Sequence, residues 1–230
     1  MTHDKIPVTP CQPGIPGLSA VSAAPGSALD VAAAARLLRE GALVCYPTET
    51  FFAVGCSAFD VFAINQIFAV KKRAEAMPLP VIIGDMEQLA MLTDTGSRTV
   101  EALAKAFWPG PLSVLVTASV RVPAVLTGES GRVAVRLTPH PVARELCREV
   151  CGPLVSTSAN ISGRAPVTAA QSLDPELVAA TGGVLDMPPA PAGGKASTLV
   201  EIAGQKTVRI VRHGAVDEEA LRAAGFAVVI

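Results

Sequence analysis

The stretch that decides the fold begins with YPTETFF at positions 46–52 and ends with KKR at positions 71–73. The apolar residues directly before it, 43–45, are typical of a short buried strand. Asp60 is a suitable N-cap for a helix that follows, because a carboxylate at the positive end of a helix is favourable. The stretch therefore predicts a strand, a hydroxyl-rich turn and then a helix that ends in three cations.

The helix of this stretch has one apolar face, since Ile64, Ile67 and Phe68 have the i, i+3, i+4 spacing. Two interpretations of the cations at 71–73 remain open at this point. They can be a solvated helix end, where cations interact favourably with the helix dipole. Alternatively, they can form an anion site in which a guanidinium and nearby hydroxyls bind phosphate or carboxylate.

Composition limits the class of protein. The chain has 230 residues, of which 50% are hydrophobic and 17% charged, so we expect one folded α/β domain rather than a disordered chain. No apolar run reaches the roughly 18 residues of a membrane span, and the first residues lack the apolar segment of a signal peptide, so a cytoplasmic protein with no membrane contact is expected. The net charge of −1 disfavours tight non-specific binding to nucleic acid. The five cysteines contain no CxxC pair, and we expect reduced thiols and no metal site.

The chain divides into two parts by composition. Residues 1–26 contain five prolines and three glycines, which predicts an extended N-terminal arm. Residues 27–230 form the domain, starting with a helix that Ser27 and Asp30 cap and that Gly41 ends. Strands and helices then alternate irregularly, which predicts a mixed sheet flanked by helices. The expected strands are 79–83, 112–116, 133–137, 154–155, 198–202, 208–211 and 226–229; the expected helices are 85–92, 99–107, 141–150 and 218–224.

A second polar segment, 156–163, follows one of the expected strands. Its hydroxyls and amides suit a phosphate-binding loop, but Ser and Asn also cap helices routinely, so both interpretations stay open. The sequence GGKAS at 193–197 lacks the spacing of a phosphate-binding P-loop, and neither a GxSxG nor an HExxH motif occurs.

Six motifs, taken in order, resemble the YrdC-like threonylcarbamoyl-adenylate synthases. The resemblance covers about residues 27–214, and each motif is unspecific alone while six in order are specific. They are YPTET at 46–50, KxR at 71–73, WPGPLS at 108–113, VAVR at 133–136, SxN at 158–160 and VRHG at 211–214.

The resemblance implies a twisted mixed sheet with a concave ligand face, and an enzyme that makes threonylcarbamoyl-AMP and pyrophosphate from L-threonine, bicarbonate and ATP. It implies that separate transferase proteins then use the product to make threonylcarbamoyladenosine in tRNA. Mg²⁺ is expected with ATP, held mainly by phosphates and water. The implied catalytic residues are Lys71 and Arg73; the ATP-binding residues are Lys71, Arg73, Ser158, Asn160 and Arg212; the threonine-binding residues are Thr50, Arg136 and Ser156.

The sequence departs from the family pattern at four places. Phe52-Ala53-Val54 stands where the family has Tyr-Gly-Leu, which implies an adjusted turn if that glycine needs φ > 0. Met77 replaces an asparagine and removes a polar nucleotide contact, while Arg132 replaces a threonine and adds a charge near the ligands. Pro80 lies within an expected strand, which predicts a short, bulged or edge strand there.

Two alternatives are kept. One is a paralogue of the same fold that uses another amino acid or carbamoyl donor. The other is a non-catalytic module that makes a weak contact with RNA through the concave face. The complete set of Lys71, Arg73, Ser158 and Asn160 favours an enzyme, because recognition of RNA by its shape does not require that set.

Overall fold

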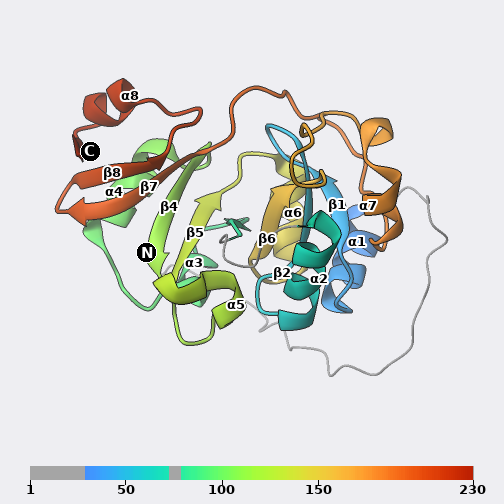
Figure 1. Cartoon of the computed structure of the whole chain (residues 1–230). Coiled ribbons are helices and arrows are strands. Elements are labelled where there is room, and N and C mark those ends of the chain that lie inside the picture. Colours follow the sequence, from blue (N-terminus) through green and yellow to red (C-terminus); the bar gives the residue numbers. More distant parts are fainter. Residues whose placement is uncertain (1–28, 73–78, 230) are drawn as a thin grey trace, which may run out of the picture.

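The computed structural model describes residues 29–72 and 79–229 as one α/β domain (Figure 1). Its strands are β1 (Val44–Pro47), β2 (Phe52–Ser57), β3 (Val81–Ile83), β4 (Leu112–Thr117), β5 (Arg132–Leu137), β6 (Leu154–Ser158), β7 (Thr198–Gly204), β8 (Thr207–Arg212) and β9 (Ala227–Val229). Its helices are α1 (Val31–Arg39), α2 (Val61–Lys71), α3 (Leu89–Leu92), α4 (Arg98–Phe107), α5 (Ala124–Thr127), α6 (Pro141–Glu149), α7 (Pro175–Ala179) and α8 (Glu218–Ala223), with 3₁₀ turns at Gly128–Ser130 and Ala170–Ser172. None of the described helices is long and apolar enough to cross a membrane.

The strands form one mixed sheet in the order β1-β2-β6-β3-β5-β4-β7-β8-β9. The pairs β3–β5, β4–β7 and β8–β9 are parallel and the others antiparallel. In Figure 1 the strands turn from nearly upright at β1 to nearly horizontal at β8, the accumulated twist expected of a sheet this wide. The predicted α/β domain with a twisted mixed sheet is therefore confirmed.

One face of the sheet is covered along its whole width. The larger hydrophobic core lies there and contains apolar residues of α2, α4, α5 and α8 together with alternate residues of the strands. Ile64, Ile67 and Phe68 of α2 all belong to it, as their helical spacing predicts. Asp60 caps α2 by accepting a hydrogen bond from the Ala63 amide, which confirms its predicted role.

The opposite face is covered over only part of its width. A second core joins α1 and α6 to β1, β2, β6 and β3, and it ends at Ile82 of β3. Ile82 pairs with Arg136 of β5, and paired residues point to the same side of a sheet. From β5 onward this face, which we call the open half, therefore carries polar side chains instead of a helix. Ser113 of β4 and Arg212 of β8 lie on it too, since Leu199 pairs with both Ser113 and Arg212.

Of three expectations about individual elements, two were wrong. Residues Ser156 and Thr157 lie within β6 rather than in a loop, because the strand continues to Ser158 and pairs with β2. Pro80 directly precedes β3, which is short, as the proline predicted, and lies in the middle of the sheet. Ala53 lies inside β2, so no adjusted turn is needed there. The predicted arm 1–26 lies outside the described residues, as does Ser27, and Asp30 caps α1.

The glycine of the VRHG motif is required by a close approach between two backbone segments. A Cβ on Gly214 would lie 2.3 Å from the Ala196 carbonyl oxygen and 2.5 Å from the Thr198 amide nitrogen. Both atoms belong to the backbone, so neither can move away as a flexible side chain does. Gly214 thus lets the chain after β8 pack against the segment that leads into β7.

We expect Gly214→Ala to lower the free energy of unfolding by about 1–3 kcal/mol, the usual cost of forcing an extra group into a packed site. Urea denaturation monitored by circular dichroism measures this. Gly204→Ala on the adjoining hairpin is the control, because a Cβ there meets only Thr207 side-chain atoms, at 3.6 Å. Equal losses in the two variants would contradict the steric argument.

Candidate functional site

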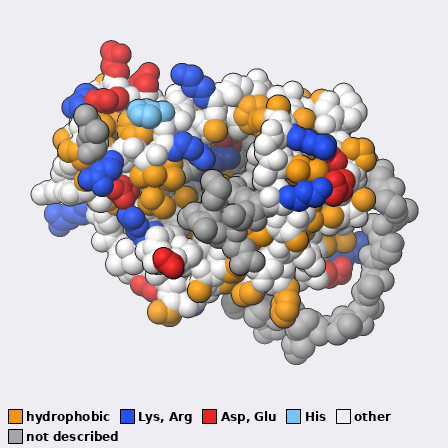
Figure 2. All heavy atoms as spheres, in the orientation of Figure 1, with side chains coloured by type: hydrophobic (Ala, Val, Ile, Leu, Met, Phe, Trp, Pro, Cys, Tyr) orange, Lys and Arg blue, Asp and Glu red, His pale blue; other side chains and the backbone are white. Residues whose placement is uncertain are grey.

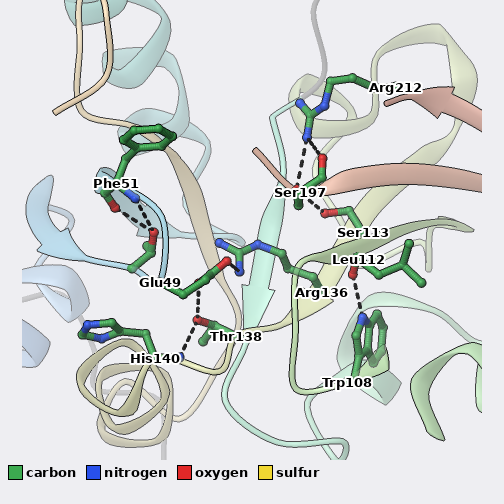
Figure 3. Close-up of polar contacts among 11 residues, drawn as sticks. Glu49, Phe51, Trp108, Leu112, Ser113, Arg136, Thr138, His140, Ser197 and Arg212 are labelled. Carbon is green, nitrogen blue, oxygen red and sulfur yellow. Dashed lines mark hydrogen bonds and ion pairs between the residues drawn. The ribbon is translucent and has the colours of Figure 1, made fainter. Parts of the chain in front are cut away.

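Arg136 lies at the boundary between the covered and the open half of the sheet face. Its side chain is 9% exposed, and its Nη1 donates to Glu49 Oε1 in an ion pair. Glu49 Oε2 also accepts a hydrogen bond from Thr138 Oγ1 at 3.3 Å. Figure 3 shows Arg136 reaching from β5 toward Glu49, which lies in the β1–β2 turn. The cation is thus held by a partner from another part of the sheet.

Arg212 lies on the same open half. Its Nη2 donates to the carbonyl oxygen of Ser197 at 2.8 Å and to Ser197 Oγ at 3.1 Å, and Ser197 Oγ lies 3.0 Å from Ser113 Oγ (Figure 3). Partial burial lowers the pKa of Arg212 from its usual value, and the positive charge of Arg136 lowers it further. The two arginines therefore lie close enough to repel each other, and an anion between them would relieve that repulsion. Figure 2 shows Lys and Arg side chains at the middle of this face.

A segment that we call the strap (residues 186–197) runs from the β1 side of the sheet to β7, across the top of Figure 1. It is tied down along its length. The Pro189 carbonyl oxygen lies 2.9 Å from His140 Nε2, and the Gly193 amide donates to the Thr50 carbonyl oxygen at 2.7 Å. The Ala192 amide donates to the Glu49 carbonyl oxygen at 3.1 Å, so the strap fixes the β1–β2 turn that contributes to the site.

Lys71 is buried rather than solvated. It is 3% exposed, and its Nζ donates to the carbonyl oxygens of Ser158 at 2.5 Å and of Asn160 at 2.7 Å. The structure thus brings together three of the residues that the sequence assigned to the nucleotide. Lys72, in contrast, is exposed and pairs with Glu176 at 2.9 Å, so the solvated-end interpretation fits Lys72 and is wrong for Lys71.

Asn160 carries a buried acceptor. Its Nδ2 donates to the carbonyl oxygens of Ile161 at 3.2 Å and Arg164 at 2.6 Å. Because both partners are acceptors, the side-chain amide must present its nitrogen to them and its Oδ1 to the other side. The Oδ1 atom is buried and has no hydrogen-bond partner among the described residues. A buried acceptor without a donor is unfavourable, so this atom is suited to receive a donor from a ligand.

The residues assigned to threonine are divided between surface and interior. Thr50 is half-buried in the β1–β2 turn beside the strap. Ser156 is 7% exposed and follows Val155, whose carbonyl oxygen accepts a hydrogen bond from the buried Tyr46 hydroxyl group at 3.2 Å. Burial raises the pKa of Tyr46, so Tyr46 is neutral and adds no charge to the site.

Other predicted residues lie elsewhere. Arg73 and Met77 lie outside the described residues. Arg132 does not add a free charge near the ligands, because its Nη1 pairs with Glu201 at 2.7 Å and this contact lowers the pKa of the Glu201 carboxyl. Cys147 is buried in α6, while Cys151 is exposed beyond the end of that helix. No cluster of three metal-ligating side chains occurs within 29–72 and 79–229.

Sequence reasoning missed four residues of the site: Glu49, Ser113, Ser197 and His140. Glu49 and Ser113 lie inside motifs that were already recognised, YPTET and WPGPLS, so a role for each could have been suspected. Ser197 and His140 carried no such signal, because their contacts with Arg212 and with the Pro189 carbonyl oxygen form only in the folded chain.

Comparisons with known proteins agree on one family. A family model named Sua5/YciO/YrdC, described as "Telomere recombination", matches residues 36–214. A threonylcarbamoyl-AMP synthase of Methylococcus capsulatus is 41% identical over 133 residues, which cover 58% of this chain and 72% of that protein. A threonylcarbamoyl-AMP synthase of Pyrococcus abyssi is 42% identical over 137 residues, which cover 60% of this chain but only 40% of that longer protein.

Solved structures share the fold. The crystal structure of P. abyssi Sua5 complexed with L-threonine has a TM-score of 0.78 and 32% identity, and the match covers 86% of this chain and 58% of that one. Escherichia coli YciO has a TM-score of 0.70 at 19% identity, a likeness that shows the fold alone.

We expect Lys71→Met to lower the free energy of unfolding by about 2–4 kcal/mol, because removal of a buried donor leaves two carbonyl oxygens without it. Urea denaturation is the measurement. Lys72→Met is the matched control and should cost less than about 1 kcal/mol, as exposed ion pairs contribute little. If Lys72→Met cost as much, the buried anchor assigned to Lys71 would be refuted.

The strap anchor predicts a dependence of stability on pH. Burial lowers the pKa of His140 below its usual value of 6.5, so the unfolded chain binds a proton more readily than the folded protein. Stability should therefore be complete above about pH 6.5 and fall as the pH decreases below it. Thermal melts of wild type and His140→Gln between pH 8 and 5 check this: the variant should lose less stability over that range, and parallel curves would contradict the assignment.

Proposed function

Because this chain belongs to the Sua5/YciO/YrdC family, we propose that it is an L-threonylcarbamoyladenylate synthase, a nucleotidyltransferase. It converts L-threonine, bicarbonate and ATP into threonylcarbamoyl-AMP and pyrophosphate. Separate tRNA-modifying transferase proteins then take the product. The observation that carries the proposal is the pair of arginines, Arg136 and Arg212, on the open half of the sheet face, next to the YPTET turn.

The threonine side of the site is assigned to Thr50, Arg136 and Ser156. Arg136 binds the carboxylate through its planar fork, since guanidinium and carboxylate match in geometry. Thr50 comes from the turn held by the strap, so its backbone position is fixed before substrate arrives.

The nucleotide side is assigned to Lys71, Arg73, Ser158, Asn160 and Arg212. The contacts in the structure support a positioning role for Lys71, because its ammonium holds the backbone of Ser158 and Asn160. Asn160 Oδ1 offers the acceptor described above, and Arg212 offers positive charge toward phosphate. ATP brings Mg²⁺ held mainly by its own phosphates and water.

The reaction joins two anions, and the residues of the open half offset their repulsion. The threonine amine and bicarbonate give threonine carbamate and water. A carbamate oxygen then forms a bond to the α-phosphorus of ATP as the bond from that phosphorus to the β-phosphate oxygen breaks and pyrophosphate leaves. No covalent enzyme intermediate is needed, so positioning and electrostatic stabilisation carry the step.

We expect pyrophosphate release to require both threonine and bicarbonate, and to fall by roughly tenfold or more with serine, which lacks one methyl group. A coupled pyrophosphate assay with each substrate omitted in turn measures this. Equal rates with serine or glycine would indicate a paralogue with another amino-acid substrate. Release without bicarbonate would exclude carbamate chemistry.

A further inference from the structure

Glu49 has no part in the assignments above, although its carboxylate forms an ion pair with Arg136. Its two carboxylate oxygens have different partners, Arg136 Nη1 for Oε1 and Thr138 Oγ1 for Oε2. Its backbone carbonyl oxygen accepts the Ala192 amide of the strap at 3.1 Å. A residue of a turn is thereby held at both its side chain and its main chain.

The pair leaves most of the guanidinium available. An arginine has five N–H donors, and within the described residues Arg136 uses only Nη1, toward Glu49. A second carboxylate can therefore bind the remaining edge. The orientation of that edge depends on Glu49, because a side chain of this length has several rotatable bonds that the ion pair fixes.

The charges around Arg136 also favour a fixed orientation of its side chain. Arg136 and Arg212 repel each other: burial lowers the pKa of Arg212, and the positive charge of Arg136 lowers it further. The carboxylate of Glu49 lies on the other side of Arg136 and offsets that repulsion, which keeps Arg136 from turning away (Figure 3).

We propose that Glu49 is a positioning residue that holds Arg136 with its unused edge toward the carboxylate of the amino-acid substrate, and so sets the affinity for threonine. This rests on the proposed function, which supplies the substrate. Thr138 supports this arrangement, because its hydroxyl group donates a hydrogen bond to the second carboxylate oxygen of Glu49.

A purely structural ion pair would have different consequences. Its loss would lower stability and reduce activity with every substrate alike. A positioning role predicts an effect confined to threonine, because ATP is assigned to other residues.

The decisive variant is Glu49→Gln, which keeps the shape of the side chain and removes its charge. We expect the KM for threonine to rise at least about tenfold, equivalent to about 1.4 kcal/mol, while kcat and the KM for ATP change less than about twofold. Thr138→Val should raise the same KM by a smaller factor, and the double variant should cost less than the sum of the two free-energy changes.

Glu201→Gln is the matched control. Like Glu49, Glu201 is paired with arginine on the sheet. It accepts hydrogen bonds from Arg132 at 2.7 Å and from Arg209 at 2.8 Å, and neither arginine is assigned to substrate. Its KM for threonine should stay within about twofold of wild type. An equal rise in KM for both substrates in Glu49→Gln, or an unchanged KM for threonine, would overturn the proposal.

A ligand-free measurement separates this inference from the proposed function. The guanidinium N–H resonances of Arg136 in ¹⁵N NMR should be protected from exchange in wild type and Glu201→Gln, and lose protection in Glu49→Gln. Equal exchange rates of the Arg136 guanidinium protons in all three proteins would overturn the proposal that Glu49 holds Arg136 in place. A wild type that binds no threonine by calorimetry would instead refute the proposed function and the substrate named here.

Discussion

The structure depends on the difference in cover between the two faces of one sheet. One face has helices along its whole width, while α1 and α6 cover the other only as far as β3. Polar groups can lie on a sheet face only where water or a ligand can reach them or where partners satisfy them. Arg136, Ser113 and Arg212 lie where the helices end, so the open half and the site are the same feature of the fold.

Several arginines on the open half are paired with glutamates before any ligand binds. Arg136 is held by Glu49, and Arg132 and Arg209 share Glu201, so the cations keep fixed directions without a ligand. A site that orders its charged groups before binding does not have to order them again when substrate arrives. The ammonium group of the buried Lys71 is also fixed without a ligand, because it donates hydrogen bonds to the backbone carbonyl oxygens of Ser158 and Asn160.

Local patterns predicted those parts of the fold that local physics decides. The cap at Asp60 and the apolar face of α2 followed from spacing, and both were confirmed. The continuation of β6 from Ser156 to Ser158 could not be predicted, since serine and threonine suit a loop by propensity, and pairing with β2 keeps them extended. Pro80 limits its strand as expected: it lies just outside β3, and its carbonyl oxygen accepts a hydrogen bond from the Ser156 amide, so a short central strand begins directly after it.

Sequence motifs grouped some residues of the candidate site, but they did not predict the contacts between distant segments. Lys71, Ser158 and Asn160 were grouped by their resemblance to a family, and the structure brings them together. The link between Glu49 and Arg136 spans 87 positions of sequence, and the strap contacts Arg212 through Ser197, which directly precedes β7. No pattern within one segment contains such information, because it is a property of the register of the whole sheet.

The most direct test of the account is a crystal structure of the protein with L-threonine and an ATP analogue whose α,β bridge cannot be cleaved. The account predicts the threonine carboxylate on Arg136 and the triphosphate between Arg212 and the Ser158–Asn160 segment, with both ligands on the open half of the sheet face. Ligands bound on the helix-covered face, or a threonine carboxylate that makes no contact with Arg136, would contradict it.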